Sequence, residues 1–240
     1  MTSTTKKVNT VKVMFNRELK SFFASPMAYV VGVIFLVITG FLVFNFFFLG
    51  KKAELRSFFE FLPVLFTFFI PALTMRVFSE EKRVGSLETL VTLPVKSSEV
   101  VTAKFLASLV SCLIMLAPTL FYVLTCAVFG NPDYGPIICG YIGAVFLIAS
   151  YTAIGLFASS ITKNQVLSFF VALVICCVLT FLSNFAVLMP AAIANFIAFV
   201  STASHFESIS RGIIDLRDVI YFVSLTVVFL LFTNHSVKKI

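Results

Sequence analysis

The sequence from Ser79 to Lys104 reads SEEKRVGSLETLVTLPVKSSEVVTAK and is the longest charged interval in the chain. Strongly apolar runs flank it on both sides, so it marks a polar connection between two apolar segments. Gly85-Ser86 and the run from Pro94 to Ser98 interrupt it, which predicts two short helices within the connection. The flanking apolar runs therefore decide what kind of fold contains this connection.

The composition predicts an integral membrane protein. Of the 240 residues, 60% are hydrophobic, 31 are Phe and 12% are charged, whereas about a quarter of the residues of a soluble domain are charged. Because lipid offers no hydrogen bonds to free backbone groups, only helices and closed barrels span a bilayer. The apolar runs are continuous rather than alternating, which favours an all-α protein over a barrel.

Six segments of one domain, residues 1–240, are predicted to span the membrane. A helix needs about 20 apolar residues to cross the hydrocarbon layer. The predicted spans are 27–49, 58–77, 105–129, 137–160, 166–188 and 215–233. The last apolar run, from Val219 to Phe232, is too short by itself, so we expect this helix to begin near Asp215.

Residues 8–23 are predicted to form an amphipathic helix along the membrane surface. Phe15, Leu19 and Phe22 recur on its apolar side and Arg17 lies on its polar side, as is typical of a basic interfacial helix. Glu18 lies within the apolar stripe, where an unpaired carboxylate is costly. Two interpretations stay open: Glu18 pairs with a basic group of the polar connections, or it is a tolerated carboxylate that reaches water.

The distribution of basic residues predicts the orientation. With six spans, both termini share one side with the connections at 79–104 and 161–165, and that side holds thirteen of the 18 Lys and Arg residues. The other side holds Lys51, Lys52, Arg56, Arg211 and Arg217. Since basic residues accumulate in cytoplasmic loops, both termini are predicted to be cytoplasmic. The basic excess then serves topology and contact with membrane lipids, and we expect no nucleic-acid partner.

No motif for catalysis, cofactor binding or metal binding is found. The segment from Gly130 to Pro136 has the glycines of a phosphate loop but lacks its Lys, His205 and His235 stand alone, and the five cysteines lack ligand spacing. Away from their first and last few residues, the predicted spans carry no Asp, Glu, Lys, Arg or His, which disfavours ion-coupled transport. We therefore expect a protein that is not an enzyme and that takes energy for any directed work from another chain.

The charged connection resembles one family of membrane proteins. Phe78 to Leu90, followed by Leu93 to Val95, is similar to the segment after the second span in permease subunits of ABC-2 type transporters, the type-2 ATP-binding-cassette exporters. Ser204 to Ser208 and the charged residues before the last span resemble the gliding-motility and nitrous-oxide-reductase-maturation subset. The resemblance covers nearly the whole chain.

This resemblance implies how the chain works and with what. It implies a dimer of permease subunits, homo- or heterodimeric, in a bacterial plasma membrane, with two ABC ATPase subunits that hold the ATP and magnesium. The connection would carry a coupling helix that docks on the ATPase. Its coupling residues would be Glu80, Glu81, Gly85, Ser86, Leu87, Glu88, Leu90, Val91 and Pro94. The local sequence agrees, because Ser86 is a good helix cap and Glu88 suits the first turn.

The second long connection, residues 189–218, lies on the outer side of the predicted topology. Ala191 to Val200 is apolar but too short to span, so we expect interfacial or re-entrant helices before the last span. The charged residues of this connection are predicted to pair with one another as a structural clamp. They are His205, Glu207, Arg211, Asp215, Arg217 and Asp218.

Three alternatives stay open at the level of sequence. A channel or secondary transporter would work without an ATPase, and the uncharged spans do not exclude a passive pore. An intramembrane enzyme would need an arranged nucleophile or metal set. A membrane anchor for a larger assembly would leave the charged 79–104 connection without a role.

Overall fold

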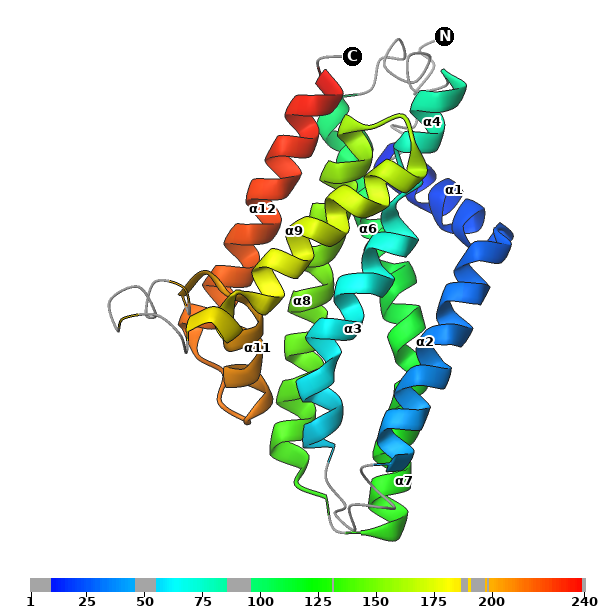
Figure 1. Cartoon of the computed structure of the whole chain (residues 1–240). Coiled ribbons are helices and arrows are strands. Elements are labelled where there is room, and N and C mark those ends of the chain that lie inside the picture. Colours follow the sequence, from blue (N-terminus) through cyan, green and yellow to red (C-terminus); the bar gives the residue numbers. More distant parts are fainter. Residues whose placement is uncertain are drawn as a thin grey trace, which may run out of the picture.

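The protein is a helical bundle, seen here in a computed structural model that describes residues 10–45, 55–85, 96–130, 132–186, 190, 197 and 199–238 (Figure 1). No β-strand occurs among these residues, and six helical segments are long and apolar enough to cross a membrane. The prediction of an all-α, multi-span membrane protein is therefore confirmed.

Six helical segments form the spans. They are α2 (Pro26–Phe44), α3 (Arg56–Thr74), α6 (Ser97–Leu116) with α7 (Leu120–Phe129), α8 (Tyr134–Ile161), α9 (Gln165–Ala186) and α12 (Leu216–Lys238). The short helices are α1 (Thr10–Ala24), α4 (Ser79–Val84) and α11 (Thr202–Ser210). The 3₁₀ turn η2 (Ala117–Thr119), which contains Pro118, joins α6 to α7, because proline disrupts α-helical hydrogen bonding.

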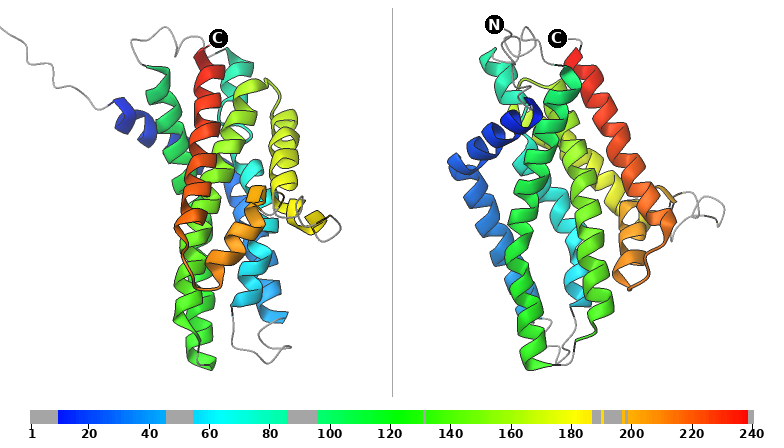
Figure 2. Two further views of the ribbon diagram at one scale, coloured as in Figure 1. Left: turned by 90° about the vertical axis from the view of Figure 1, so that its left-hand side faces the viewer. Right: turned by 180° about the vertical axis from the view of Figure 1, so that it is seen from behind.

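The helices are arranged around α8, which is buried over more of its length than any other spanning segment. The C-terminal end of α12, helix α4 and the α8–α9 turn share one end of the bundle, which we name the α4 end; α7 finishes at the opposite end, the α7 end (Figures 1 and 2). Helix α1 is inclined to the spanning helices near the α4 end, and α2 runs from it toward the α7 end. Because the number of spans is even, the first span starts and the last span ends at the same end of the bundle (Figure 1).

Several helix boundaries follow directly from local sequence. Ser25 caps α2 with its hydroxyl, which accepts a hydrogen bond from the Met27 amide at 3.3 Å, and Pro26 takes the first helical position. Gly85 ends α4 in a left-handed conformation (φ 78°), which glycine adopts readily. The third span begins at Ser97, well before the predicted start at Phe105, because its polar first turns continue the helix beyond the apolar run.

Buried hydroxyl groups join four helices in the middle of the bundle. The Tyr151 hydroxyl on α8 lies 2.5 Å from Thr180 Oγ1 on α9 and 2.8 Å from Thr202 Oγ1 on α11. Thr67 Oγ1 on α3 lies 2.8 Å from Thr180 Oγ1. Because Tyr151 is near the middle of α8, these contacts hold α11 against the bundle. Most of the predicted first piece, 191–200, lies outside the described residues, so the interfacial or re-entrant arrangement stays a prediction.

Helix α8 packs tightly against Thr74 of α3 at Gly155. A β-carbon built on Gly155 would lie 1.9 Å from Thr74 Oγ1 and 2.8 Å from Thr74 Cβ. Both residues are fully buried. A hydrogen atom at this position is therefore needed for the two backbones to pack.

We expect Gly155→Ala to lower the free energy of unfolding by roughly 1–3 kcal/mol, because the added methyl group forces α3 and α8 apart. Gly32→Ala on α2 is the matched control, since no atom lies within 4 Å of a β-carbon there. Unfolding in mixed micelles measures both variants. Equal stability of the two would contradict the close α3–α8 contact.

Candidate functional site: a charged junction at the α4 end

Helix α4 contains the part of the predicted coupling segment that the structure describes. Glu80 and Glu81 lie in its first turn and Gly85 ends it. Ser86, Leu87, Glu88, Leu90, Val91 and Pro94 lie outside the described residues, so their predicted role as coupling residues stays a prediction.

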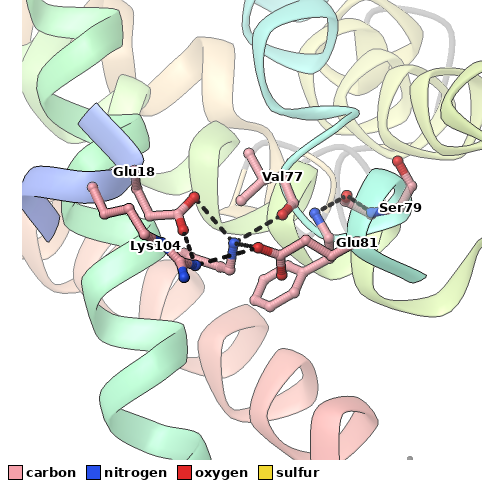
Figure 3. A network of polar contacts seen from close by, with 8 residues as sticks. Glu18, Val77, Ser79, Glu81 and Lys104 are labelled. Atoms are coloured by element: carbon pink, nitrogen blue, oxygen red, sulfur yellow. Dashed lines mark hydrogen bonds and ion pairs between the residues drawn. The ribbon is translucent and has the colours of Figure 1, made fainter. Parts of the chain in front are cut away.

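A buried lysine at the start of the third span organises this end of the bundle. The Lys104 side chain on α6 is 2% exposed, and its Nζ lies 2.9 Å from Glu81 Oε1 on α4 and 3.1 Å from Glu18 Oε2 on α1 (Figure 3). The same ammonium group donates a hydrogen bond to the Val77 carbonyl at 3.1 Å. One cation therefore holds three separate parts of the chain together.

Arg17 completes the ion cluster from the surface. Its Nη2 lies 2.8 Å from Glu18 Oε1 and 3.6 Å from Glu81 Oε1. We name Arg17, Glu18, Glu81 and Lys104 the charged junction. Its two cations and two carboxylates balance, which is what burial of charge requires.

The junction keeps Glu18 ionised. Burial by itself raises the pKa of this carboxyl, but the charge of Lys104 and the hydrogen bonds from Arg17 and Lys104 outweigh that effect and leave the pKa lowered. The hydrogen bond to Glu18 in turn raises the pKa of Arg17. Of the two interpretations left open for Glu18, pairing with a base is thus the one that the structure supports.

The segment from Phe78 to Lys82 also bonds to the end of α8, which in turn bonds to α12. Ser159 Oγ on α8 accepts hydrogen bonds from the backbone amides of Phe78 (2.9 Å) and Ser79 (3.0 Å). Lys82 Nζ donates to the Ser160 carbonyl, which also accepts from Ser236 Oγ of α12 at 3.1 Å. Helix α4 is thus joined by polar contacts to α1, α6 and α8, and through the Ser160 carbonyl indirectly to α12.

Helix α1 has the amphipathic character that its sequence predicts. Phe22 is buried, and Phe15, Leu19 and Glu18 are half-buried on the side that packs against α6, whereas Arg17 is exposed. The apolar side of α1 thus packs against α6. Glu18 lies on the same side, where its carboxylate pairs with Lys104.

The predicted outer clamp forms as two separate pairs rather than one network. His205 Nδ1 on α11 lies 2.6 Å from Asp218 Oδ1 on α12, and both side chains are buried. His205 Nε2 lies 2.9 Å from the Phe199 carbonyl, and its ring stacks on Tyr221 at 4.1 Å between centroids.

The other members of the predicted clamp lie near the surface. Arg211 and Glu207 form an exposed pair at 2.5 Å, one helical turn apart on α11. Asp215 accepts a hydrogen bond from the Arg217 amide at 3.0 Å and so starts α12. Within the described ranges no ion pair of the Arg217 side chain is seen.

Sequence reasoning missed the residue at the centre of the junction. Lys104 counted there only toward the basic side of the topology, and its position at the edge of an apolar run gave no sign of burial. No group of three or more His, Cys, Asp and Glu residues suited to a metal ion occurs in the part of the chain that the structure describes. The junction is built to bind helices together, since its charges neutralise one another.

Comparison with known protein families gives the class of the protein. Residues 4–237 match the family described as ABC-2 family transporter protein, and the chain belongs to that family. It is a multi-pass permease component of an ABC transporter, a class that associates with an ABC ATPase. A search of curated proteins found no match to this chain.

Proposed function

We propose that this chain is the permease subunit of an ATP-driven exporter and that the 79–104 segment receives the force of its ATPase. In this proposal the α4 end is cytoplasmic, two permease subunits form the pathway in a bacterial plasma membrane, and two ATPase subunits hold ATP and magnesium. The chain itself carries out no chemistry. The resemblance of Ser204 to Ser208 supports a place near the gliding-motility and nitrous-oxide-reductase-maturation subset.

The single observation that carries this proposal is the contact of Lys104 with both Glu18 and Glu81. It connects the coupling segment through α4 to the interfacial helix α1 and to the start of α6. Since the cation is buried, separating it from either carboxylate is costly. The three elements therefore move together when α4 is pushed.

The proposed motion follows from these connections. ATP-driven closure of the ATPase subunits would displace α4, and the junction would carry that displacement into α1 and α6. Through Ser159 and Ser160 the same displacement reaches α8, the central helix. A rocking of the bundle that opens an outward or lateral route is the expected result.

Glu88→Lys and Leu87→Asp test the coupling role of the predicted helix. If it docks on the ATPase, each change is expected to lower stimulation of ATP hydrolysis by the reconstituted complex by at least about tenfold, because Leu87→Asp adds an uncompensated charge to the contact and Glu88→Lys reverses one. Ile213→Asp, at an exposed position between α11 and α12, is the matched control. Complex formation and stimulation at the unmodified level in both loop variants would overturn the assignment.

A further inference from the structure

A polar cavity lies between the end of α1 and the segment that leads from α3 into α4. Its volume is about 370 Å³. It is lined by Glu18, Ser21, Phe22, Ala24, Ser25, Arg76, Val77, Glu80 and Glu81. The cavity therefore lies where helix α1 turns into the first span, α2.

An apolar groove of about 220 Å³ adjoins this cavity, and Phe22 lines both. The groove runs between α2, α3 and α6, and its walls include Phe23, Leu36 and Met115. Its lining residues Tyr29, Val33 and Ile114 are 58%, 59% and 45% exposed, so the groove opens to the surrounding lipid. The polar cavity and the apolar groove thus meet at the Phe22 side chain, so a molecule with a polar head and an apolar chain could occupy both.

Arg76 is positioned to meet a phosphate group in the polar cavity. Its Nη1 donates to Ser25 Oγ and its Nη2 donates to the Phe22 carbonyl at 3.3 Å, while the guanidinium lies 5.3 Å from the centre of the Phe22 ring. A guanidinium has five N–H donors. These contacts with described residues use two of them and orient the group for further hydrogen bonds.

The charges around the cavity balance, which bears on the kind of headgroup. The carboxylates Glu18, Glu80 and Glu81 and the cation Arg76 line the cavity. Arg17 and Lys104 do not line it but pair with Glu18 and Glu81, so three cations offset the three carboxylates. A headgroup without net charge suits such surroundings better than an anionic one, because an extra negative charge would be uncompensated. Since Glu18 and Glu81 are engaged by Lys104, the exposed carboxylate of Glu80 is the one that faces an incoming amine.

We propose that this composite site binds one zwitterionic aminophospholipid, with its phosphate on Arg76, its ammonium on Glu80 and an acyl chain in the groove beside Gly32. An ammonium donates hydrogen bonds to a carboxylate, whereas a choline group has no N–H to donate. The bound lipid fills the angle between α1 and α2 and lies against Glu18 and Glu81 of the charged junction. The site belongs to this chain alone and does not depend on the proposed coupling to an ATPase.

Binding of defined lipids to the full-length chain tests the proposal. Native mass spectrometry of the purified chain, titrated with phosphatidylethanolamine, phosphatidylcholine and phosphatidylglycerol of identical acyl chains, gives the three affinities. We expect phosphatidylethanolamine to bind about tenfold more tightly than either competitor, the usual effect of one hydrogen bond between charged groups. Equal or tighter binding of phosphatidylglycerol would overturn the proposal.

Two variants test the two halves of the site. Glu80→Gln keeps the shape of the side chain and is expected to equalise the affinities for phosphatidylethanolamine and phosphatidylcholine. Gly32→Phe fills the groove, where an added β-carbon meets no atom within 4 Å, and is expected to weaken all three lipids by at least about tenfold, since each displaced methylene is worth about fourfold.

Gly32→Ala is the control for the groove, because its methyl group leaves most of the space open. It is expected to bind phosphatidylethanolamine like the unmodified chain. Equal affinity of Gly32→Phe and Gly32→Ala would show that no acyl chain occupies the groove. An unchanged preference for the ethanolamine lipid in Glu80→Gln would show that this carboxylate does not read the amine, and either result contradicts the site as proposed.

Discussion

Lys104→Met is expected to lower the free energy of unfolding by about 3 kcal/mol, because it leaves Glu18 and Glu81 partly buried without their shared cation. Unfolding in mixed micelles, followed by loss of helical signal, measures this change. Lys12→Met is the matched control, because Lys12 on α1 is exposed and outside the junction, and we expect less than about 0.5 kcal/mol there.

A triple variant separates the stability of the junction from its role. Lys104→Met combined with Glu18→Gln and Glu81→Gln removes the uncompensated charges and is expected to regain most of the lost stability. Stimulation of the ATPase is expected to stay low in this variant, because α4 is no longer tied to α1 and α6. Normal stimulation in the triple variant would show that the junction only stabilises the fold.

Acidification acts on the junction with a definite sign. The folded state holds the pKa of Glu18 below its ordinary value of 4.5, so this carboxylate stabilises the protein fully above that pH. Its contribution is lost as the pH falls through the lowered pKa of the folded state. Glu18→Gln should therefore reduce the loss of stability on acidification relative to the unmodified chain.

Asp218→Asn is expected to lower the free energy of unfolding by roughly 2 kcal/mol, because the buried hydrogen bond to His205 loses its charge. This bond joins α11 to α12, so proteolysis or hydrogen exchange should show loosening of the 199–218 segment before the rest of the bundle opens. Thermal unfolding of the detergent-solubilised chain provides the measurement.

The exposed pair on α11 supplies the comparison for Asp218. Arg211→Gln breaks the contact with Glu207, but both side chains are about half exposed and only one helical turn apart, so we expect roughly 0.5 kcal/mol or less. If Arg211→Gln destabilised the protein as much as Asp218→Asn, burial of the His205–Asp218 pair would not be what fixes α11.

The fold class could be predicted because apolar run length and continuity are local properties. The start of α2 was equally accessible, since Ser25 and Pro26 form a recognisable cap. The boundaries of the third span were harder to predict from the sequence. The segment from Ser97 to Lys104 continues the third span as a helix, and α1 packs against α6.

In the charged junction, the sequence did not identify the partner of Glu18. Glu18 was visible as a carboxylate in an apolar stripe, which predicts a partner without naming it. Its partner Lys104 is far away along the chain, whereas the sequence pointed to the charged segment from Ser79 to Arg83 as the possible partner. Only the inclination of α1 across α6 selects Lys104 (Figure 3).

In the outer connection, too, the sequence predicted that charged residues pair but not which ones pair. Glu207 and Arg211 are one helical turn apart, so their pairing follows from local spacing. His205 and Asp218 belong to different helices, and the chain reverses between them at Gly212, which has a left-handed φ of 96°. The sequence predicted pairing among these residues, but the division into a buried and an exposed pair requires the turn.

The most direct measurement of the central proposal is photo-crosslinking in the assembled complex with its ATPase. A benzophenone amino acid is placed at Leu87 in one preparation and at the exposed Ile213 in another. The proposal predicts an adduct between permease and ATPase from position 87 and none from position 213. Absence of the adduct at position 87, or equal adducts at both positions, would contradict the assignment of the 79–104 segment as the docking element.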